Sequence, residues 1–314
     1  MVLNMVLKCA GSVGHKHALV KPRSLILLND LQRRQVPHTT NIVARMVQYA
    51  LIITPALEES CICMPAELRI FPVLGIGEVH PGDDIAALVL AALTHMGETL
   101  AERDIVVVTQ KIVSKAEHRI IDPSTIEPSH MARMAAAQGH KDAAYYEVVL
   151  RESRRIVKMD RGVLVTETHH GLICANAGVD ESNVAGGSTV TLLPVDPDAS
   201  ARTLRAALHE RAGVDVAVII SDTFGRAWRE GQVNVAIGVA GIAPLADYAN
   251  QPDAYGYVMH ASNIAIADEL ASAAELVMGK VDAVPVAIVR GYPYVAAAAS
   301  ASQLIRAPEK DLFR

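Results

Sequence analysis

The apolar residues 216–220 lead directly into the polar residues 221–223, and this junction restricts the fold more than any other feature of the chain. A run of this kind, rich in β-branched side chains, is typical of a buried strand. Asp222 follows the run, and acidic side chains at the end of a buried strand lie where α/β proteins hold ligands and metals. We therefore expect a strand that ends at this junction and presents Asp222 to a ligand.

Strand-like and helix-like segments continue from residue 68 onward, without the regular spacing of a doubly wound sheet. Two strand-like segments are neighbours between residues 162 and 177, which favours an α+β fold of mixed sheets with packed helices. The strands are expected at 68–74, 104–109, 162–168, 171–177, 189–194, 216–220 and 285–290. The helices are expected at 85–100, 129–158, 199–211 and 263–278, with aspartates capping the first and third.

Residues 1–67 differ from the rest because no helical or strand period is sustained there. We interpret them as an N-terminal extension that is poorly ordered or lies outside the fold, with translation from Met64 as one explanation. Residues 68–314 are then the functional domain. An inserted subdomain at about 110–165 is an alternative organisation within it.

A net charge of −5 and an aromatic content of 4% argue against nucleic acid as a partner, because phosphate binding needs basic residues and base stacking needs aromatic rings. Four cysteines in 314 residues do not form a disulfide framework, so we expect reduced thiols and a cytoplasmic protein. No apolar run is long and uniform enough to span a bilayer, so no membrane association is expected. The chain also lacks G-x-x-x-x-G-K-[ST] and G-x-G-x-x-G, which argues against a P-loop or Rossmann domain.

Two acidic residues follow strand-like segments and are candidates for a metal site. Asp180 lies in a glycine-led turn, and Asp222 is followed by Thr223. Carboxylate and hydroxyl oxygens suit Mg²⁺ or Mn²⁺ ions that bridge phosphates. Aspartates at strand ends also serve as caps or turn formers, so the residues alone leave both interpretations open.

Two pairs of basic residues could hold an anion. Lys111 and Lys115 follow a strand, although a solvated helix start explains them as well. Arg226 and Arg229 could bind a carboxylate or phosphate in bidentate fashion, or could form a surface salt-bridge cluster. Cys174 lies in an apolar run typical of a core, and no G-x-S-x-G motif is present. The residues alone favour a metal-dependent, phosphate-handling enzyme without naming its reaction.

Five segments together resemble the coenzyme F420:L-glutamate ligase (γ-glutamyl ligase) family, and they occur in the family's order. They are residues 109–117 (TQKIVSKAE), 178–184 (GVDESNV), 193–200 (LPVDPDAS), 221–232 (SDTFGRAWREGQ) and 267–269 (ADE). The resemblance runs from about residue 70 to the tail of the chain. Each segment is unspecific by itself, whereas the ordered set is highly specific.

The resemblance implies a ligase with a fold of its own that joins L-glutamate to the carboxylate of the coenzyme F420 precursor, F420-0, and then adds further γ-linked glutamates. GTP would be cleaved to GDP and phosphate, with an acyl phosphate as the activated intermediate. Two divalent ions (Mg²⁺ or Mn²⁺), K⁺ and a homodimer are also implied. A metal-dependent nucleotide phosphohydrolase and a non-catalytic nucleotide-binding protein are the alternatives.

Position by position, the resemblance implies metal ligands and nucleotide contacts. The metal ligands are Asp180, Asp222 and Thr223, and the GTP contacts are Gln110, Lys115, Asn183 and a turn formed by Ile76, Gly77, Glu78 and Val79. Our own inference adds Arg226 or Arg229 as catalytic groups that neutralise developing charge.

The chain departs from the family's pattern at two positions. Lys280 stands where some members have an acidic metal ligand, which questions a third carboxylate ligand. His118 stands where the family usually has glycine, and a left-handed backbone there would be strained.

Overall fold

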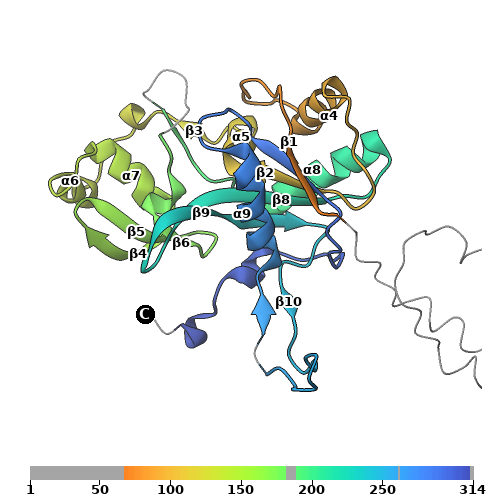
Figure 1. Cartoon of the computed structure of the whole chain (residues 1–314). Helices are drawn as coiled ribbons and strands as arrows, with labels where there is room; N and C mark the ends of the chain where they lie inside the picture. Colours follow the sequence, from red (N-terminus) through yellow and green to blue (C-terminus); the bar gives the residue numbers. More distant parts are fainter. Residues whose placement is uncertain (1–66, 182–188, 261, 312–314) are drawn as a thin grey trace, which may run out of the picture. The chain divides into compact units, whose positions relative to one another are not determined.

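A five-stranded mixed sheet forms the centre of the fold (Figure 1). This computed structural model describes residues 67–181, 189–260 and 262–311, all within one compact unit, Met64–Arg314. The strand order is β1 (Arg69–Pro72), β12 (Val286–Arg290), β2 (Ile105–Thr109), β8 (Ala217–Arg226) and β9 (Arg229–Ala240). β2 and β8 are parallel, and the other neighbours are antiparallel. The expected α+β architecture of mixed sheets with packed helices is confirmed, whereas the N-terminal extension stays a prediction because residues 1–66 lie outside the described ranges.

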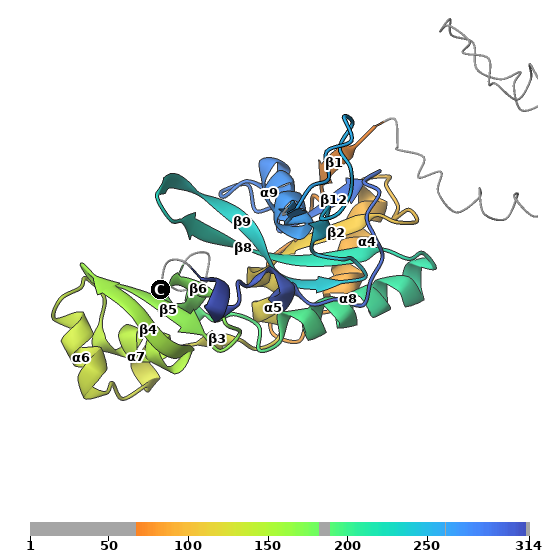
Figure 2. The ribbon, with the colours of Figure 1, turned by 90° about the horizontal axis from the view of Figure 1, so that it is seen from below.

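Alternating side chains of the central strands form a hydrophobic core on each face of the sheet. In β2, Val106 and Val108 face one core, and Ile105 and Val107 face the other. The first core is covered by α4 (Ile85–His95), α5 (Gln110–Ala116) and α8 (Pro197–Ala212), and the second by α9 (Ile266–Met278). Figure 2 shows α8 and α9 on opposite sides of the sheet. Burial of each such side chain contributes about 1.5–3 kcal/mol, which holds the central strands between two layers.

Local capping signals set the limits of the helices beside the sheet. Asp196 caps α8 by accepting a hydrogen bond from the backbone N–H of Ala199, and Gly213 ends it with a left-handed φ of 70°. Asp84 caps α4 in the same way. α4 is shorter than the predicted 85–100, because the chain leaves the helix at Gly97, whose φ is 73°.

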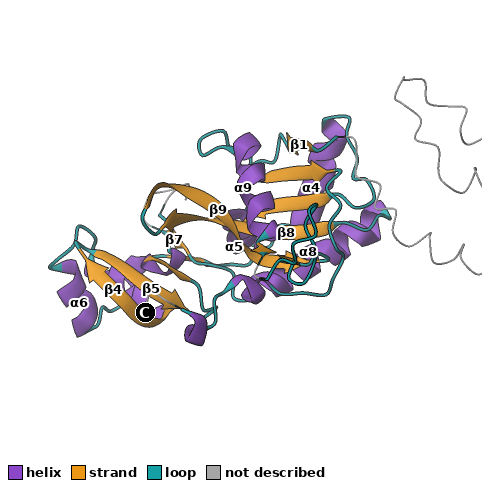
Figure 3. Ribbon diagram, turned by 60° about the horizontal axis from the view of Figure 1, so that its bottom comes forward, coloured by secondary structure: helices purple, strands orange, loops and turns teal. Residues whose placement is uncertain are grey.

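Residues 120–191 contain a second group of helices and strands with its own hydrophobic core (Figure 3). Its elements are β3 (Ile120–Ile121), η1 (Pro123–Thr125), α6 (His130–Ala136), α7 (Ala143–Arg151), β4 (Ser153–Asp160), β5 (Val163–Thr168), β6 (Ile173–Ala175), η2 (Asn176–Gly178) and β7 (Val190–Thr191). Tyr146 is fully buried in this core and donates a hydrogen bond to the Gly162 carbonyl at 2.7 Å. The subdomain considered at about 110–165 overlaps this group without matching its limits.

The predicted helix at 129–158 is wrong at its C-terminal end. Two short helices end by residue 151, and residues 153–160 form strand β4, which pairs with β5. Arg161 and Gly162 join the two strands, and both have positive φ values, 48° and 79°. A two-residue turn with this backbone matches the twist of a hairpin, so the turn selects strand over helix.

The strand that carries Asp222 does not end at residues 221–223 as predicted. β8 continues to Arg226 because β9 pairs with it along this whole length, with Asp222 opposite Val235. A bulge between Ile220 and Ser221 shifts the register just before Asp222. β2 ends beside Ser221, so from Asp222 onward β8 has β9 as its partner and a free second edge in this sheet. The predicted end of the strand is therefore wrong, whereas the proposed contact of Asp222 with a ligand stays a prediction.

The remaining elements lie toward the C-terminus. They are β10 (Ala246–Asp247), β11 (Asn263–Ile264), η3 (Ala301–Leu304) and η4 (Pro308–Lys310). Residues 263–264 are a strand and not the start of the predicted helix, which begins at Ile266. None of the helices in the described ranges is long and apolar enough to cross a membrane.

Candidate functional site

The parallel pairing of β2 and β8 brings the separate sequence motifs together. Thr109 lies opposite Ser221 in the ladder, so α5 begins directly beside the position of Asp222. Asp180 comes from the group of residues 120–191, where it pairs through its backbone with Thr191 of β7. The carboxyl end of β2, the point where its parallel pairing with β8 stops, and a third segment thus meet at one edge of the sheet, which is a common place for a ligand.

Asp222 has the most perturbed carboxyl group at this edge. Its side chain is half-buried, and loss of solvation raises its pKa from 3.8 to about 6. The negative charge of Asp180 adds to this rise, whereas a hydrogen bond from the Thr223 backbone N–H and the charges of Lys280 and Lys111 oppose it. Two aspartates and two lysines therefore share one electrostatic environment.

Lys111 links α5 to Asp180. The Lys111 ammonium nitrogen lies 2.8 Å from the Asp180 carboxylate, and 19% of the lysine side chain and 35% of the aspartate side chain are exposed. Lys115, one turn later, is buried and contacts the Glu78 carboxylate at 2.5 Å. The interpretation of these lysines as a solvated helix start is wrong, because each is directed at a carboxylate.

The predicted nucleotide-contact residues surround α5. Gln110 is its first residue, and the buried Gln110 amide oxygen accepts a hydrogen bond from the Ser114 hydroxyl at 2.8 Å. Residues 76–79 form an extended loop between β1 and α4. Within this loop Ile76 and Val79 are buried, whereas Gly77 and Glu78 are exposed. Asn183, the last predicted contact, lies outside the described residues.

Thr223 belongs to a hydrogen-bond chain that the sequence did not indicate. Its hydroxyl donates to the Asn234 amide oxygen at 2.7 Å, and the Asn234 amide nitrogen donates to a Glu275 carboxylate oxygen at 2.8 Å. The Lys280 ammonium donates to the Thr223 hydroxyl oxygen and lies 3.9 Å from Glu275. β9 and α9 supply Asn234 and Glu275, so only the folded arrangement could identify them.

The two arginines predicted as catalytic lie at the far end of the β8–β9 hairpin. Arg226 and Arg229 face each other in the ladder, and the Arg226 guanidinium donates to the backbone carbonyls of Glu230 and Gly231. Four residues along a strand span about 13 Å, so Arg226 is remote from Asp222 along the hairpin. The structure does not bring the arginines together with the aspartates.

The donor atoms fit one hard divalent cation. Asp180 and Asp222 supply carboxylate oxygens and Thr223 a hydroxyl, which are ligands that Mg²⁺ and Mn²⁺ accept. In the described ranges, no group of three or more His, Cys, Asp or Glu side chains is placed to hold a metal ion. Burial raises the pKa of the Cys174 thiol to about 12, and the nearby negative charge of Asp222 adds to this rise. The thiol therefore stays protonated.

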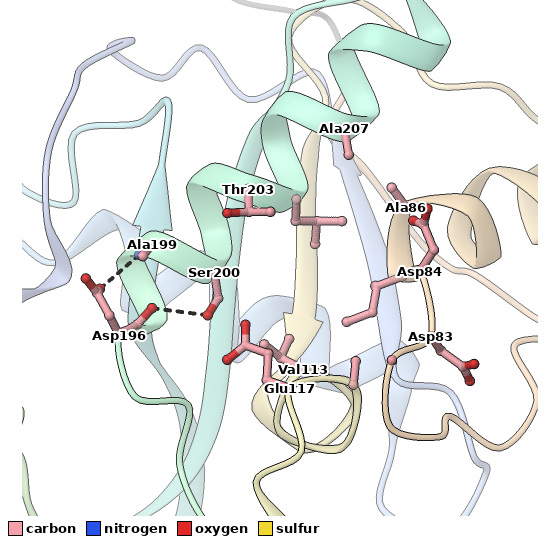
Figure 4. Close-up of a pocket in the computed structure, with 14 residues that line it drawn as sticks. Asp83, Asp84, Ala86, Val113, Glu117, Asp196, Ala199, Ser200, Thr203 and Ala207 are labelled. Atoms are coloured by element: carbon pink, nitrogen blue, oxygen red, sulfur yellow. Dashed lines mark hydrogen bonds between the residues drawn. The ribbon is translucent and has the colours of Figure 1, made fainter.

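A cavity of about 510 Å³ lies between α4, α5 and α8 (Figure 4). Its walls include Ile85, Val113 and Leu204, and none of the predicted site residues lines it. Its carboxylates include Asp84 and Asp196, which cap α4 and α8. These two acids have a structural role as helix caps.

Comparison with known proteins identifies close relatives of the chain. The family model described as F420-0:Gamma-glutamyl ligase matches residues 74–291. A coenzyme F420:L-glutamate ligase of Methanothermobacter thermautotrophicus is 46% identical over 250 residues, which cover 79% of this chain and 99% of the relative. A protein of the same name from Methanopyrus kandleri is 44% identical over 252 residues, covering 79% and 98%. A third, from Methanocaldococcus jannaschii, is 42% identical over 216 residues, covering 68% and 86%.

Proposed function

Because the chain belongs to the F420-0:gamma-glutamyl ligase family, we propose that it joins L-glutamate to the carboxylate of F420-0 by an amide bond. The observation that carries the proposal is the meeting of Asp180, Asp222 and Lys111 at the edge where β2 ends beside β8. Amide formation from a carboxylate needs an activating step, and we propose GTP as the phosphoryl donor. Further γ-linked glutamates would be added by the same chemistry.

The proposed reaction has two steps. In the first, a carboxylate oxygen of F420-0 attacks the γ-phosphorus of GTP, the bond to the bridging oxygen breaks, and GDP leaves. In the second, the glutamate amine attacks the acyl carbon, phosphate leaves, and the nitrogen loses its extra proton. Phosphoryl transfer of this kind depends on positioning and charge stabilisation and needs no nucleophile from the protein. The protonated state of Cys174 is consistent with this requirement.

The residues near the end of β2 and near Asp222 have distinct roles in this proposal. Asp180 and Asp222 would hold Mg²⁺ or Mn²⁺, which would supply positive charge against the repulsion between polyphosphate and carboxylate. The hydroxyl of Thr223, the third predicted ligand, is hydrogen-bonded to Asn234 and Lys280. Lys115 and Gln110, on α5, would contact the nucleotide together with residues 76–79. Lys115 is buried and already faces the exposed Glu78, so its ammonium is held beside that loop.

The test is an assay of the purified chain with GTP, Mn²⁺, L-glutamate and F420-0, read by mass spectrometry and GDP release. We expect a product with one or more added glutamates and stoichiometric GDP. Asp222→Asn should lose turnover, whereas Asp160→Asn, a change at an exposed β4 carboxylate, should not. GTP hydrolysis at full rate without acceptor would favour a phosphohydrolase, and GTP binding without turnover a non-catalytic protein. Light scattering tests the proposed homodimer.

A further inference from the structure

We propose that the ammonium group of Lys280 is a built-in cation that occupies the Thr223 end of this site and restricts divalent-ion binding to a single ion held by Asp180 and Asp222. The inference rests on the proposed function for the location of the metal site. It goes further because it assigns a role to Lys280 and limits the number of ions that the site takes.

The backbone places Lys280 beside β8 by a turn that depends on glycine. α9 ends at Met278, and Gly279 follows with φ 64° and ψ 179°, a conformation that is essentially restricted to glycine. A Cβ atom at Gly279 would also collide with the carboxylate of Asp282. This turn directs the chain back toward the hairpin, where the Lys280 ammonium donates to the Thr223 hydroxyl.

The hydrogen bonds of Thr223 leave little capacity for a metal. A hydroxyl has one proton and two lone pairs. The Thr223 proton is donated to Asn234, and one lone pair accepts from Lys280. Asn234 is buried and is held in turn by Glu275, so this arrangement cannot easily rotate to free the hydroxyl. An ion at Thr223 would have to displace the ammonium.

The charges at the site lead to the same conclusion. The carboxylates of Asp180, Asp222 and Glu275 carry three negative charges, and the ammonium groups of Lys111 and Lys280 carry two positive charges. Lys280 contacts Thr223, the neighbour of Asp222 in β8, so its positive charge lies at this end of the site. This set of five side chains has a net charge of −1, so one divalent ion brings the total to +1 and a second would bring it to +3. The Lys280 side chain is also 60% exposed, so its charge can face an incoming anion without a metal.

The experiment counts Mn²⁺ bound to the purified full-length chain, with the metal alone, by electron paramagnetic resonance of free Mn²⁺. We expect one site in the wild type and its loss in Asp222→Asn. Lys280→Glu should raise the count to two, because it replaces the ammonium by a carboxylate beside Thr223. Lys280→Met should tighten the single site by about tenfold, because a like charge near the ion is removed.

Lys158→Met is the matched control, because Lys158 is an exposed lysine of β4, and it should leave the count and affinity unchanged. Two sites in the wild type would overturn the proposal, and so would a count of one in folded Lys280→Glu or an unchanged affinity in Lys280→Met. Circular dichroism establishes that each variant is folded. The measurement needs neither nucleotide nor F420-0, so failure of the ligase assay and failure of this inference are separate results.

Discussion

The ammonium nitrogen of Lys111 lies 2.8 Å from the Asp180 carboxylate and ties α5 to the segment that follows η2. The two residues are 69 positions apart in the chain, and each follows its own strand. The contact fixes the distance between a residue proposed to hold a metal and the helix proposed to contact the nucleotide. It can therefore serve both stability and function.

A double-mutant cycle of Lys111→Met and Asp180→Asn should separate these two contributions. We expect a coupling free energy of about 1 kcal/mol in urea unfolding, since the pair is partly screened by solvent. Both single variants should also lose turnover. This loss should be much larger than the small fraction of protein that the lower stability would unfold. A coupling near zero would mean that the contact has no energetic weight in the folded protein.

Asp222 should destabilise the metal-free protein at neutral pH. Its pKa is raised from 3.8 to about 6, so the folded state holds the proton more tightly than the unfolded chain does. The contribution of this group is favourable below about pH 4, falls as the pH rises toward 6, and is an added cost above that. Asp222→Asn should therefore increase the free energy of unfolding at pH 7.5 by about 1–3 kcal/mol, an amount reduced by partial exposure.

The measurement is urea unfolding by circular dichroism in EDTA at pH 4.5 and 7.5. The gain should be smaller at pH 4.5, and Asp160→Asn should show no comparable gain at either pH. A variant that is more stable but inactive would indicate that Asp222 is retained for function. Lower stability of Asp222→Asn at pH 7.5 would instead indicate a structural carboxylate.

The parts of the fold that follow local rules could be predicted from the sequence. The limits of α8 depend on Asp196 and Gly213, and β2 depends on a continuous apolar run, so neighbouring residues contain the necessary information. The continuation of β8 past Asp222 could not be predicted, because it depends on pairing with the separate segment β9.

The same distinction applies to the site. Asp180, Asp222 and Lys115 each follow a strand-like segment and could be proposed from the sequence. Asn234 and Glu275 could not, because Asn234 reaches Thr223 by strand pairing across 11 residues, and Glu275 reaches Asn234 by helix packing across 41 residues. The catalytic role of Arg226 stays a prediction, and proximity in sequence to Asp222 does not mean proximity along an extended strand.

His118 bears a local backbone strain that glycine should relieve. It follows the C-cap of α5 with φ 59°, and its N–H donates to the Lys115 carbonyl at 3.2 Å. Glycine is preferred at a left-handed position of this kind. The left-handed backbone of His118 agrees with the strain that the sequence predicted. The strain costs about 1–2 kcal/mol, whereas glycine loses about 0.5–1 kcal/mol more chain entropy on folding. His118→Gly should therefore raise the free energy of unfolding by about 0.5 kcal/mol, and His118→Val should lower it. Equal stability of the two variants would refute the argument.

Arg226 and Lys115 should differ sharply in their effects on turnover. The guanidinium of Arg226 is used by carbonyls of its own hairpin, whereas the buried ammonium of Lys115 faces the loop proposed to contact the nucleotide. We expect Arg226→Ala to keep most of the turnover, and we expect the same of Arg229→Ala, since Arg229 is exposed.

Lys115→Met should reduce turnover by about 10- to 100-fold, the range that corresponds to loss of one hydrogen bond to a charged group. Steady-state kinetics with GTP as the varied substrate measures both effects. A large loss in Arg226→Ala, with normal folding by circular dichroism, would return the hairpin arginines to the reacting groups as the sequence predicted.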